Sequence, residues 1–208
     1  MARSIWPLIQ PPSGPANDET TEAILSSARA AVLDFGVRRT TLSDVARRAG
    51  VSRMTVYNRF GDLHALMRAL MTLEFGTLLE RVADEAGGED ARGRLVAALV
   101  LIARQLPTNP LFRKVRAAEP ELLAPYVLER LGQTQRVGLE LIERSIVDGQ
   151  SEGSIRSGKV RALAAIVLLI EQSFVFSAAT IPGATRNEML TELEAALHGA
   201  LAPPGSRR

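Results

Sequence analysis

The sequence predicts an all-α protein of about nine helices, arranged as a small N-terminal three-helix domain and a larger C-terminal helical domain. Between Ala16 and Leu106 there is no proline, so this stretch lacks the residue that most strongly breaks a helix. Apolar residues recur there at intervals of three and four, as they do in amphipathic helices. No stretch alternates apolar and polar residues in the way a half-buried strand does. Helices are therefore expected throughout the folded part of the chain.

Composition predicts where the folded part begins and ends. Residues 1–16 hold four of the eleven prolines and show no helical period, so we expect a flexible N-terminal arm. The same reasoning predicts a flexible tail over residues 202–208. Between them we predict one domain over residues 17–62 and a second, larger domain over residues 63–201.

The first predicted helix begins near Asn17, a suitable N-cap, and ends at Gly36. One apolar stripe runs along it, formed by Ile24, Leu25, Ala28, Val32 and Phe35. A long helix begins at Leu63 and stops at the Gly87-Gly88 pair. Further helices are predicted over Ala91–Gln105, Pro110–Ala118, Pro125–Gln150, Lys159–Ala179 and Thr185–Leu201. Pro110 and Pro125 are placed in first turns, where the missing N–H costs little.

Two short helices and a tight turn are predicted over residues 41–60. Thr41 and Asp44 have the spacing of a helix-capping pair. Gly50 permits a sharp turn, and Ser52 caps the second short helix. The arrangement is that of a helix-turn-helix. Its predicted core consists of Val45, Ala46, Ala49, Gly50, Val51, Val56 and Phe60.

Charge is concentrated around this segment. Residues 38–68 contain seven arginines and two aspartates, a net charge of +5, whereas the rest of the chain carries −3. A basic segment on a mildly acidic body indicates a contact with a polyanion. In a helix-turn-helix the second helix enters the major groove of DNA. The predicted DNA-binding residues are Thr41, Ser52, Arg53, Met54, Thr55, Tyr57, Asn58 and Arg59.

These residue types suit defined tasks. Arg53 can read guanine, Asn58 adenine, and Met54 a thymine methyl group. Hydroxyl groups of Thr55 and Tyr57 can bind phosphates. A plainer interpretation stays open, because a helical hairpin with a glycine turn is common in all-α proteins, Met54 could be half-buried packing, and the Tyr57 ring could lie on Arg53.

The motif extends beyond a generic helix-turn-helix. Its residues are Phe35-Gly36, Thr40-Thr41, Val45-Ala46, Ala49-Gly50-Val51-Ser52, Thr55-Val56-Tyr57 and Phe60. With this pattern, residues 20–69 resemble the TetR family of bacterial transcriptional regulators. The resemblance implies a homodimer, a palindromic operator and a C-terminal domain that binds a small effector. It also implies a phosphate-binding lysine near the start of the fourth helix. The aligned residue here is Leu63, and Arg59 or His64 is a candidate replacement.

The last two predicted helices indicate how two copies could associate. Lys159–Ala179 is apolar nearly all round, so it should be buried on more than one side. The final helix carries a leucine stripe that predicts a dimer interface in a four-helix bundle. The stripe consists of Leu190, Leu193, Leu197 and Leu201. In the alternative interpretation it only closes the core of one chain.

An effector pocket is predicted where polar residues interrupt apolar sequence. Glu171 and Gln172 interrupt the most hydrophobic helix, and aromatic residues could line a cavity with them. The candidate residues are Phe112, Tyr126, Glu171, Gln172, Phe174 and Phe176. Two alternatives stay open, because such aromatic residues are more often core residues, and Glu171 could pair with an arginine across the dimer.

Composition excludes several classes of site. The chain has no cysteine, and its two histidines, His64 and His198, are far apart, so neither a metal nor a cofactor is expected. Nothing resembles a nucleophile with its base, so we do not expect an enzyme. The longest apolar runs, Leu95–Ala103 and Ala162–Ile170, have nine residues each. A membrane span needs ~20 such residues, so we expect a cytoplasmic protein with no membrane partner.

Together these observations predict a dimeric, sequence-specific transcriptional regulator. It is expected to be a repressor that binds a palindromic double-stranded operator and is released by a largely apolar small molecule. Two other functions stay open. The chain could be a non-sensing, architectural helix-turn-helix protein, or an all-α binding bundle that does not use DNA.

Overall fold

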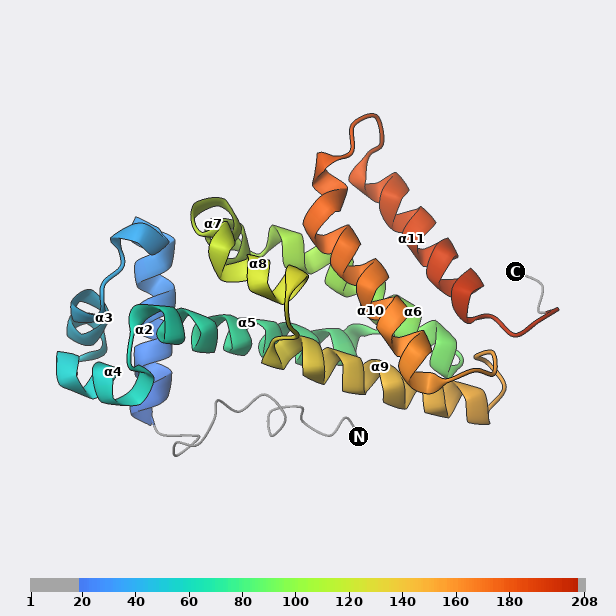
Figure 1. Ribbon diagram of the computed structural model, residues 1–208, viewed down its shortest axis with the longest axis horizontal. Helices are drawn as coiled ribbons and strands as arrows, with labels where there is room; N and C mark the ends of the chain where they lie inside the picture. Colours follow the sequence, from blue (N-terminus) through green and yellow to red (C-terminus); the bar gives the residue numbers. More distant parts are fainter. Residues whose placement is uncertain (1–18, 206–208) are drawn as a thin grey trace. The chain divides into compact units, whose positions relative to one another are not determined.

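The computed structural model describes residues 19–205, apart from the side chains of residues 122 and 126–128. Ten α-helices and three short 3-10 turns account for most of this range, and it contains no strand (Figure 1). The all-α fold class is confirmed. The helices are α2 (Glu19–Phe35), α3 (Leu42–Ala49), α4 (Arg53–Phe60), α5 (Leu63–Glu85), α6 (Ala91–Gln105), α7 (Pro110–Ala118), α8 (Pro120–Leu128), α9 (Gln133–Ser151), α10 (Val160–Ser177) and α11 (Arg186–Leu201).

One predicted helix is in fact two. The expected Pro125–Gln150 helix is divided into α8 and α9, and Pro125 lies inside α8 instead of in a first turn. The N–H groups of Glu129 and Arg130 both bond to the carbonyl of Pro125, at 3.0 and 2.9 Å, and this closes α8. Pro120 occupies the first turn of α8, where its missing N–H costs little. The predicted cap Asn17 and the two termini lie outside the described residues.

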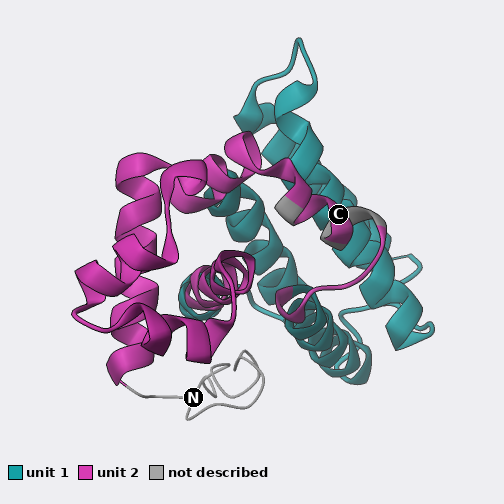
Figure 2. Ribbon diagram, turned by 60° about the vertical axis from the view of Figure 1, so that its left-hand side comes forward, with its two compact units in different colours: residues 1–3, 78–107, 135–208 teal, residues 4–77, 108–134 magenta. Residues whose placement is uncertain are grey.

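The chain forms two compact units (Figure 2). Of the described residues, unit 1 contains 78–107 and 135–205, and unit 2 contains 19–77 and 108–134. Helix α5 contributes to both, because its residues up to Thr77 belong to unit 2 and those from Leu78 to unit 1. The predicted domain boundary between residues 62 and 63 stays a prediction.

Unit 2 is built around α2, which packs against α3 and α7. Ile24, Ala28 and Val32 on its inner face are completely buried. The predicted stripe does not extend to Phe35, whose side chain is half exposed. Instead, the guanidinium of Arg48 lies 4.9 Å from the centre of the Phe35 ring. The stripe is shorter than predicted because the chain leaves the helix directly after Phe35.

Helix α7 is tied to α2 and α5 by polar contacts within unit 2. The ammonium of Lys114 donates to the carbonyl oxygen of Leu33 at 2.5 Å. The carboxylate of Glu74 accepts hydrogen bonds from Arg29 at 2.5 Å and from Asn109 at 3.1 Å. Since Asn109 is also the N-cap of α7, this carboxylate connects three helices.

Unit 1 has its core between α6 and the last two helices. Leu190, Leu193, Leu197 and Leu201 are all buried, on the helix that packs against α6. The prediction that this stripe forms the dimer interface was wrong. An amphipathic pattern records that a face is buried, but it does not record whether the same chain or another copy covers it.

Helix α10 packs against α6 and is buried on one face. Leu163, Ala164 and Val167 are buried there, while Ile166 and Leu169 are 54% and 58% exposed. The expectation that α10 is covered on several sides therefore does not hold within one chain. The segment Val160–Thr180 is also long and apolar enough to cross a membrane, with a mean hydropathy of 1.9. About 28% of its most apolar stretch is buried. Core helices of globular proteins meet the same criterion.

Replacing a leucine of the α11 stripe tests its assignment to the core. Leu197→Ala is expected to lower the free energy of unfolding by about 2–5 kcal/mol, because it leaves a cavity in unit 1. Chemical denaturation followed by circular dichroism measures the loss. Ile181→Ala, at an exposed apolar residue, is the control and should cost less than about 0.5 kcal/mol. Equal losses in both variants would contradict the assignment.

Candidate DNA-binding site

Helix α3 begins with a complete cap. The hydroxyl oxygen of Thr41 accepts the backbone N–H of Asp44 at 3.1 Å, and the same hydroxyl donates to the Asp44 carboxylate at 2.6 Å. Together with nearby Arg47, this hydrogen bond from Thr41 holds the pKa of Asp44 below its usual value. A carboxylate in the first turn also complements the helix dipole. The predicted start of the motif is therefore confirmed.

Gly50 makes the turn between the two short helices. It has φ 67° and ψ 25°, the left-handed conformation that only glycine adopts without strain. The N–H of Val51 bonds to the carbonyl of Ala46 at 3.0 Å and closes the end of α3. Glycine is favoured at this position by the backbone conformation and not by a lack of space, because a Cβ at Gly50 would meet no atom within 4 Å.

Helix α4 is held at its start and along its inner side. The Ser52 hydroxyl accepts the N–H of Thr55 at 3.0 Å and lies 2.8 Å from the Thr55 hydroxyl. Val56 is fully buried where α4 packs against α3, and Phe60, one turn later, is half-buried. These contacts fix which side of α4 faces solvent.

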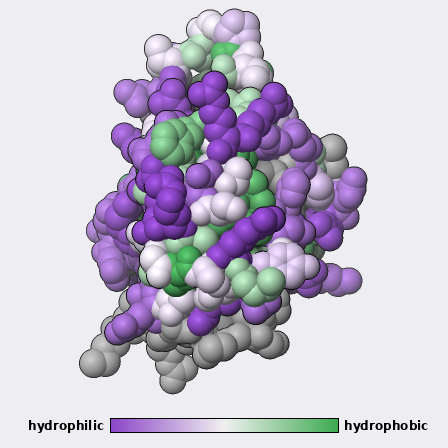
Figure 3. Space-filling model, turned by 90° about the vertical axis from the view of Figure 1, so that its left-hand side faces the viewer, coloured by the Kyte–Doolittle hydropathy of each residue, from purple (hydrophilic) through white to green (hydrophobic). Residues whose placement is uncertain are grey.

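The outer side of α4 carries the predicted base-reading residues. Arg53 and Asn58 are exposed, and Met54 and Tyr57 are 62% and 56% exposed. The alternative of Met54 as half-buried packing therefore does not hold. No cation–π contact joins Arg53 to Tyr57, both of which the structure describes. Figure 3 shows the side of the molecule that carries α3 and α4, where hydrophilic side chains predominate.

Other arginines of this segment have contacts within the chain. Arg59 donates to the Thr21 hydroxyl at 2.8 Å, which joins the end of α4 to α2. Arg48 pairs with Asp34 at 2.9 Å in addition to covering Phe35. Sequence reasoning missed both contacts, because the residues that meet are far apart in the chain.

The start of α5 differs from the pattern of the resembled family. Asp62 caps the helix by accepting the N–H of Ala65 at 2.7 Å. Leu63 is half-buried and His64 is exposed. A carboxylate therefore stands beside the position where the resemblance implies a lysine, so this helix end offers less positive charge than expected.

Neither unit contains all of the predicted effector residues. Four of them, Glu171, Gln172, Phe174 and Phe176, lie on α10 in unit 1. Phe112 is a buried residue of unit 2 whose ring meets Phe75 edge-on, with 6.0 Å between ring centres. The side chain of Tyr126 lies outside the described residues.

Glu171 is buried although it carries a carboxyl group. Its side chain is 6% exposed, and both carboxyl oxygens lack a hydrogen-bond partner within the described chain. Burial raises the pKa of Glu171 to about 8. The alternative in which Glu171 pairs with an arginine of another copy conflicts with this burial.

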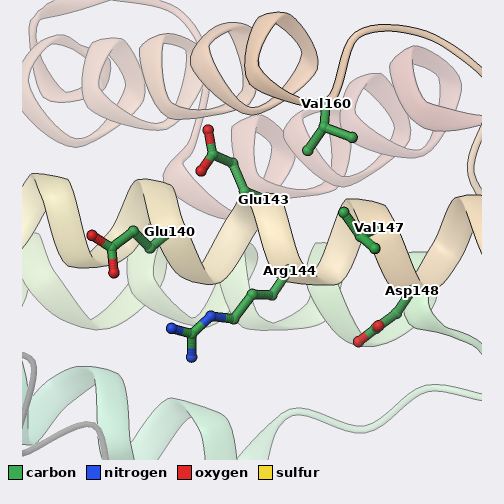
Figure 4. Close-up of a pocket in the computed structure, with 6 residues that line it drawn as sticks. All are labelled: Glu140, Glu143, Arg144, Val147, Asp148 and Val160. Atoms are coloured by element: carbon green, nitrogen blue, oxygen red, sulfur yellow. The ribbon is translucent and has the colours of Figure 1, made fainter.

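A depression in the surface of unit 1 lies elsewhere. It has a volume of about 440 Å³ and is lined by residues of α9 and the first residue of α10. Figure 4 shows Glu143 on the side of α9 that faces Val160, with Arg144 directed away. Glu143 pairs with Arg161 at 2.8 Å.

Within residues 19–205, no group of three His, Asp or Glu side chains could hold a metal ion.

Comparison with known proteins identifies the family. The family described as "Bacterial regulatory proteins, tetR family" matches residues 24–70, which include the whole helix-turn-helix. Two uncharacterized HTH-type transcriptional regulators, from Mycobacterium bovis and Mycobacterium tuberculosis, are each 39% identical over 184 residues. The aligned region covers 88% of this chain and 95% of each relative.

The chain belongs to the TetR family.

Solved structures agree on the fold of this TetR-family regulator. The repressor QsdR from R. erythropolis has a TM-score of 0.66 at 14% identity, covering 92% of this chain and 100% of that one. The repressor AlkX from Dietzia has a TM-score of 0.63 at 21% identity, covering 86% and 93%. The SmeT–triclosan complex has a TM-score of 0.60 at 20% identity, covering 90% and 94%. The TetR-family assignment makes the chain a transcriptional regulator with a DNA-binding helix-turn-helix.

The buried carboxyl of this TetR-family regulator predicts a pH-dependent stability. The pKa of Glu171 is about 8 in the fold and near its ordinary 4.5 in the unfolded chain. The contribution of Glu171 to the free energy of unfolding is therefore most favourable below pH 4.5. It is lost progressively as the pH rises from 4.5 to about 8. Glu171→Gln should raise the unfolding midpoint at about pH 8.5 much more than at about pH 5.5.

Thermal unfolding at both pH values measures this difference. Glu194→Gln removes an exposed carboxyl from α11 and serves as the control. The two variants should differ from each other much more at the higher pH than at the lower. A Glu171→Gln effect that is the same at both pH values would contradict the assignment of a buried, protonated carboxyl.

Proposed function

We propose that this TetR-family regulator is a dimeric repressor that binds a palindromic operator through α4 of each copy and is released by a small molecule. The observation that carries the DNA-binding part is the outward face of α4. Its exposed side chains combine a guanidinium, an amide, a phenol and a thioether. Val56 is buried on the other side of the helix, and Ser52 caps its start.

Each exposed side chain has a proposed role at the operator. Arg53 reads guanine, Asn58 reads adenine, and Met54 contacts a thymine methyl. Tyr57 binds phosphate through its hydroxyl and sets the register without reading sequence. The N-terminus of α3, with Thr41, meets a further phosphate. Thr55 and Ser52 share a hydrogen bond that keeps the start of α4 in place, and Arg59 holds α4 to α2.

The dimer is proposed to form through the exposed face of α10. Ala162, Ile166, Leu169 and Ser173 are all exposed and follow one another at intervals of four, three and four residues. This is the spacing of a helix–helix seam. A twofold axis between two α10 faces makes an isologous interface and gives the operator its palindromic symmetry.

The effector part of the proposal rests on α10 as well. Glu171 is a buried polar residue in an otherwise apolar stripe, and aromatic residues follow it. An apolar site with few polar groups is typical of small-molecule pockets. SmeT, a protein with a similar fold, has been solved as a complex with triclosan. Effector binding releases the operator only if the effector has different affinities for the two states of the dimer.

Selection of bound fragments from random DNA duplexes tests the proposal directly. A palindrome with two half-sites one helical turn apart, ~34–36 Å, is expected. The selected operator then allows a screen for small molecules that dissociate the complex. A non-palindromic consensus would contradict the twofold dimer, and a complex that no small molecule dissociates would favour a non-sensing DNA-binding protein.

Two substitutions on α4 should separate base reading from phosphate binding. Arg53→Ala is expected to weaken operator binding by about 1–3 kcal/mol and to relax the preference at one base pair of each half-site. Tyr57→Phe should weaken binding to all sequences alike. Fluorescence anisotropy on the operator and on single-base variants measures both effects. Arg104→Ala, an exposed arginine of unit 1, is the control. An unchanged base preference in Arg53→Ala would remove Arg53 as a base reader.

A charge on the exposed face of α10 should disrupt the dimer. Leu169→Glu is expected to shift the protein to monomer and to lower operator affinity, since a charge buried at an apolar interface is costly. Light scattering after size-exclusion chromatography measures the mass. Ile181→Glu, at another exposed apolar residue, should leave the mass unchanged. A dimeric Leu169→Glu protein would show that copies associate elsewhere.

A further inference from the structure

Glu171 is the one charged side chain that is buried within the described part of the chain. The other buried polar residue there, Thr40, donates its hydroxyl to the carbonyl of Gly36 at 2.9 Å. Neither carboxyl oxygen of Glu171 has such a partner. An unpartnered buried polar group normally costs stability, so Glu171 needs an explanation that the fold does not supply.

The residues one helical turn from Glu171 along α10 are apolar. Val167 and Val175 lie one helical turn before and after it on α10, and both are buried. Helix α6, which packs against α10, contributes Leu95, Val96, Leu99 and Ala103 to the core. A leucine or methionine at position 171 would fill such a place at lower cost. No ion pair between described residues includes Glu171.

An aromatic ring lies close along the same helix. Phe174 follows Glu171 by three residues, so the two side chains are neighbours on the surface of α10, and Phe174 is half-buried. A carboxylate beside an aromatic ring in apolar surroundings is the combination that attracts an organic cation, through charge and through the face of the ring. An anionic ligand at the same position could form an ion pair with neither the protonated nor the ionised form of Glu171.

We propose that Glu171 is the charged group of the effector site and that the effector is a protonated amine on an apolar body. This inference rests on the proposed function, in which the helical domain binds a releasing ligand. The ammonium donates to the two free carboxyl oxygens of Glu171, Phe174 contacts the cation, and the apolar body lies among the aliphatic side chains of unit 1.

Binding of the amine should change the protonation of Glu171. Because burial raises the pKa of Glu171 to about 8, the free protein holds a proton there at neutral pH. A bound ammonium favours the carboxylate, so this proton leaves to the buffer while the amine keeps its own. Amine binding at about pH 7 should therefore release about one proton per ligand.

Three ligands that differ only in their head group provide the test: octylamine, octanol and octanoate. Isothermal titration calorimetry of the full-length protein with each ligand gives the affinities. Repeating the octylamine titration in phosphate and in Tris gives the number of protons released. Octylamine should bind about tenfold or more tightly than the other two.

The same titrations on variants assign the preference to one residue. Glu171→Gln, which keeps the shape of the side chain, should lose the octylamine preference and the proton release while binding octanol as before. Glu171→Asp should keep part of both. Glu194→Gln, which removes one exposed carboxyl of unit 1, should behave as the unaltered protein.

Three results would overturn the proposal: no binding of octylamine, binding of octanol or octanoate as tight as octylamine, or a preference that survives in Glu171→Gln. Failure of the proposed function is distinguishable from these. If octanol or octanoate releases the operator, the protein remains a ligand-released repressor and only the role of Glu171 is lost. If no small molecule in the operator screen releases DNA, the effector function itself is lost.

Discussion

The position of α4 relative to α3 depends on the backbone of Gly50 and on the burial of Val56. Gly50 turns the chain through a left-handed conformation, and Val56 then packs against α3. With one side of α4 buried, the opposite side, with Met54 and Asn58, must face solvent because side chains four residues apart share a face. Two local features therefore determine which chemistry the molecule presents to DNA.

Unit 2 joins this DNA-binding surface to α7. Lys114 holds the last turn of α2 through the carbonyl of Leu33, and Glu74 binds Arg29 of α2 and the cap of α7 together. Arg38, directly after α2, also bonds to Glu119 at the end of α7 at 3.3 Å. Because α2 packs in turn on α3, a displacement of α7 would act on the helix-turn-helix through hydrogen bonds and not only through apolar packing. Under the proposed function, such links are a route by which ligand binding would alter DNA affinity.

Much of the motif could be predicted from sequence because its determinants are local. Thr41, Gly50 and Ser52 act on residues within five positions, and the structure has the cap, the turn and the second cap where the sequence indicates.

The leucine stripe of α11 could not be assigned from sequence, because its spacing is the same for a core and for a subunit interface. The division of the predicted Pro125–Gln150 helix was missed for a different reason, since Pro125 was expected in a first turn, which proline favours, and lies instead inside α8, where its missing N–H removes a helical hydrogen bond. Contacts such as Lys114 with Leu33, 81 residues apart, leave no local pattern.

The central claim is that two outward α4 faces, held by a twofold dimer, contact successive major grooves. Hydroxyl-radical footprinting of the selected operator tests it most directly. The account predicts two protected segments of equal length on one face of the duplex, with centres about 10 base pairs or a small multiple of that apart. A single continuous footprint, or two segments on opposite faces of the duplex, would contradict it.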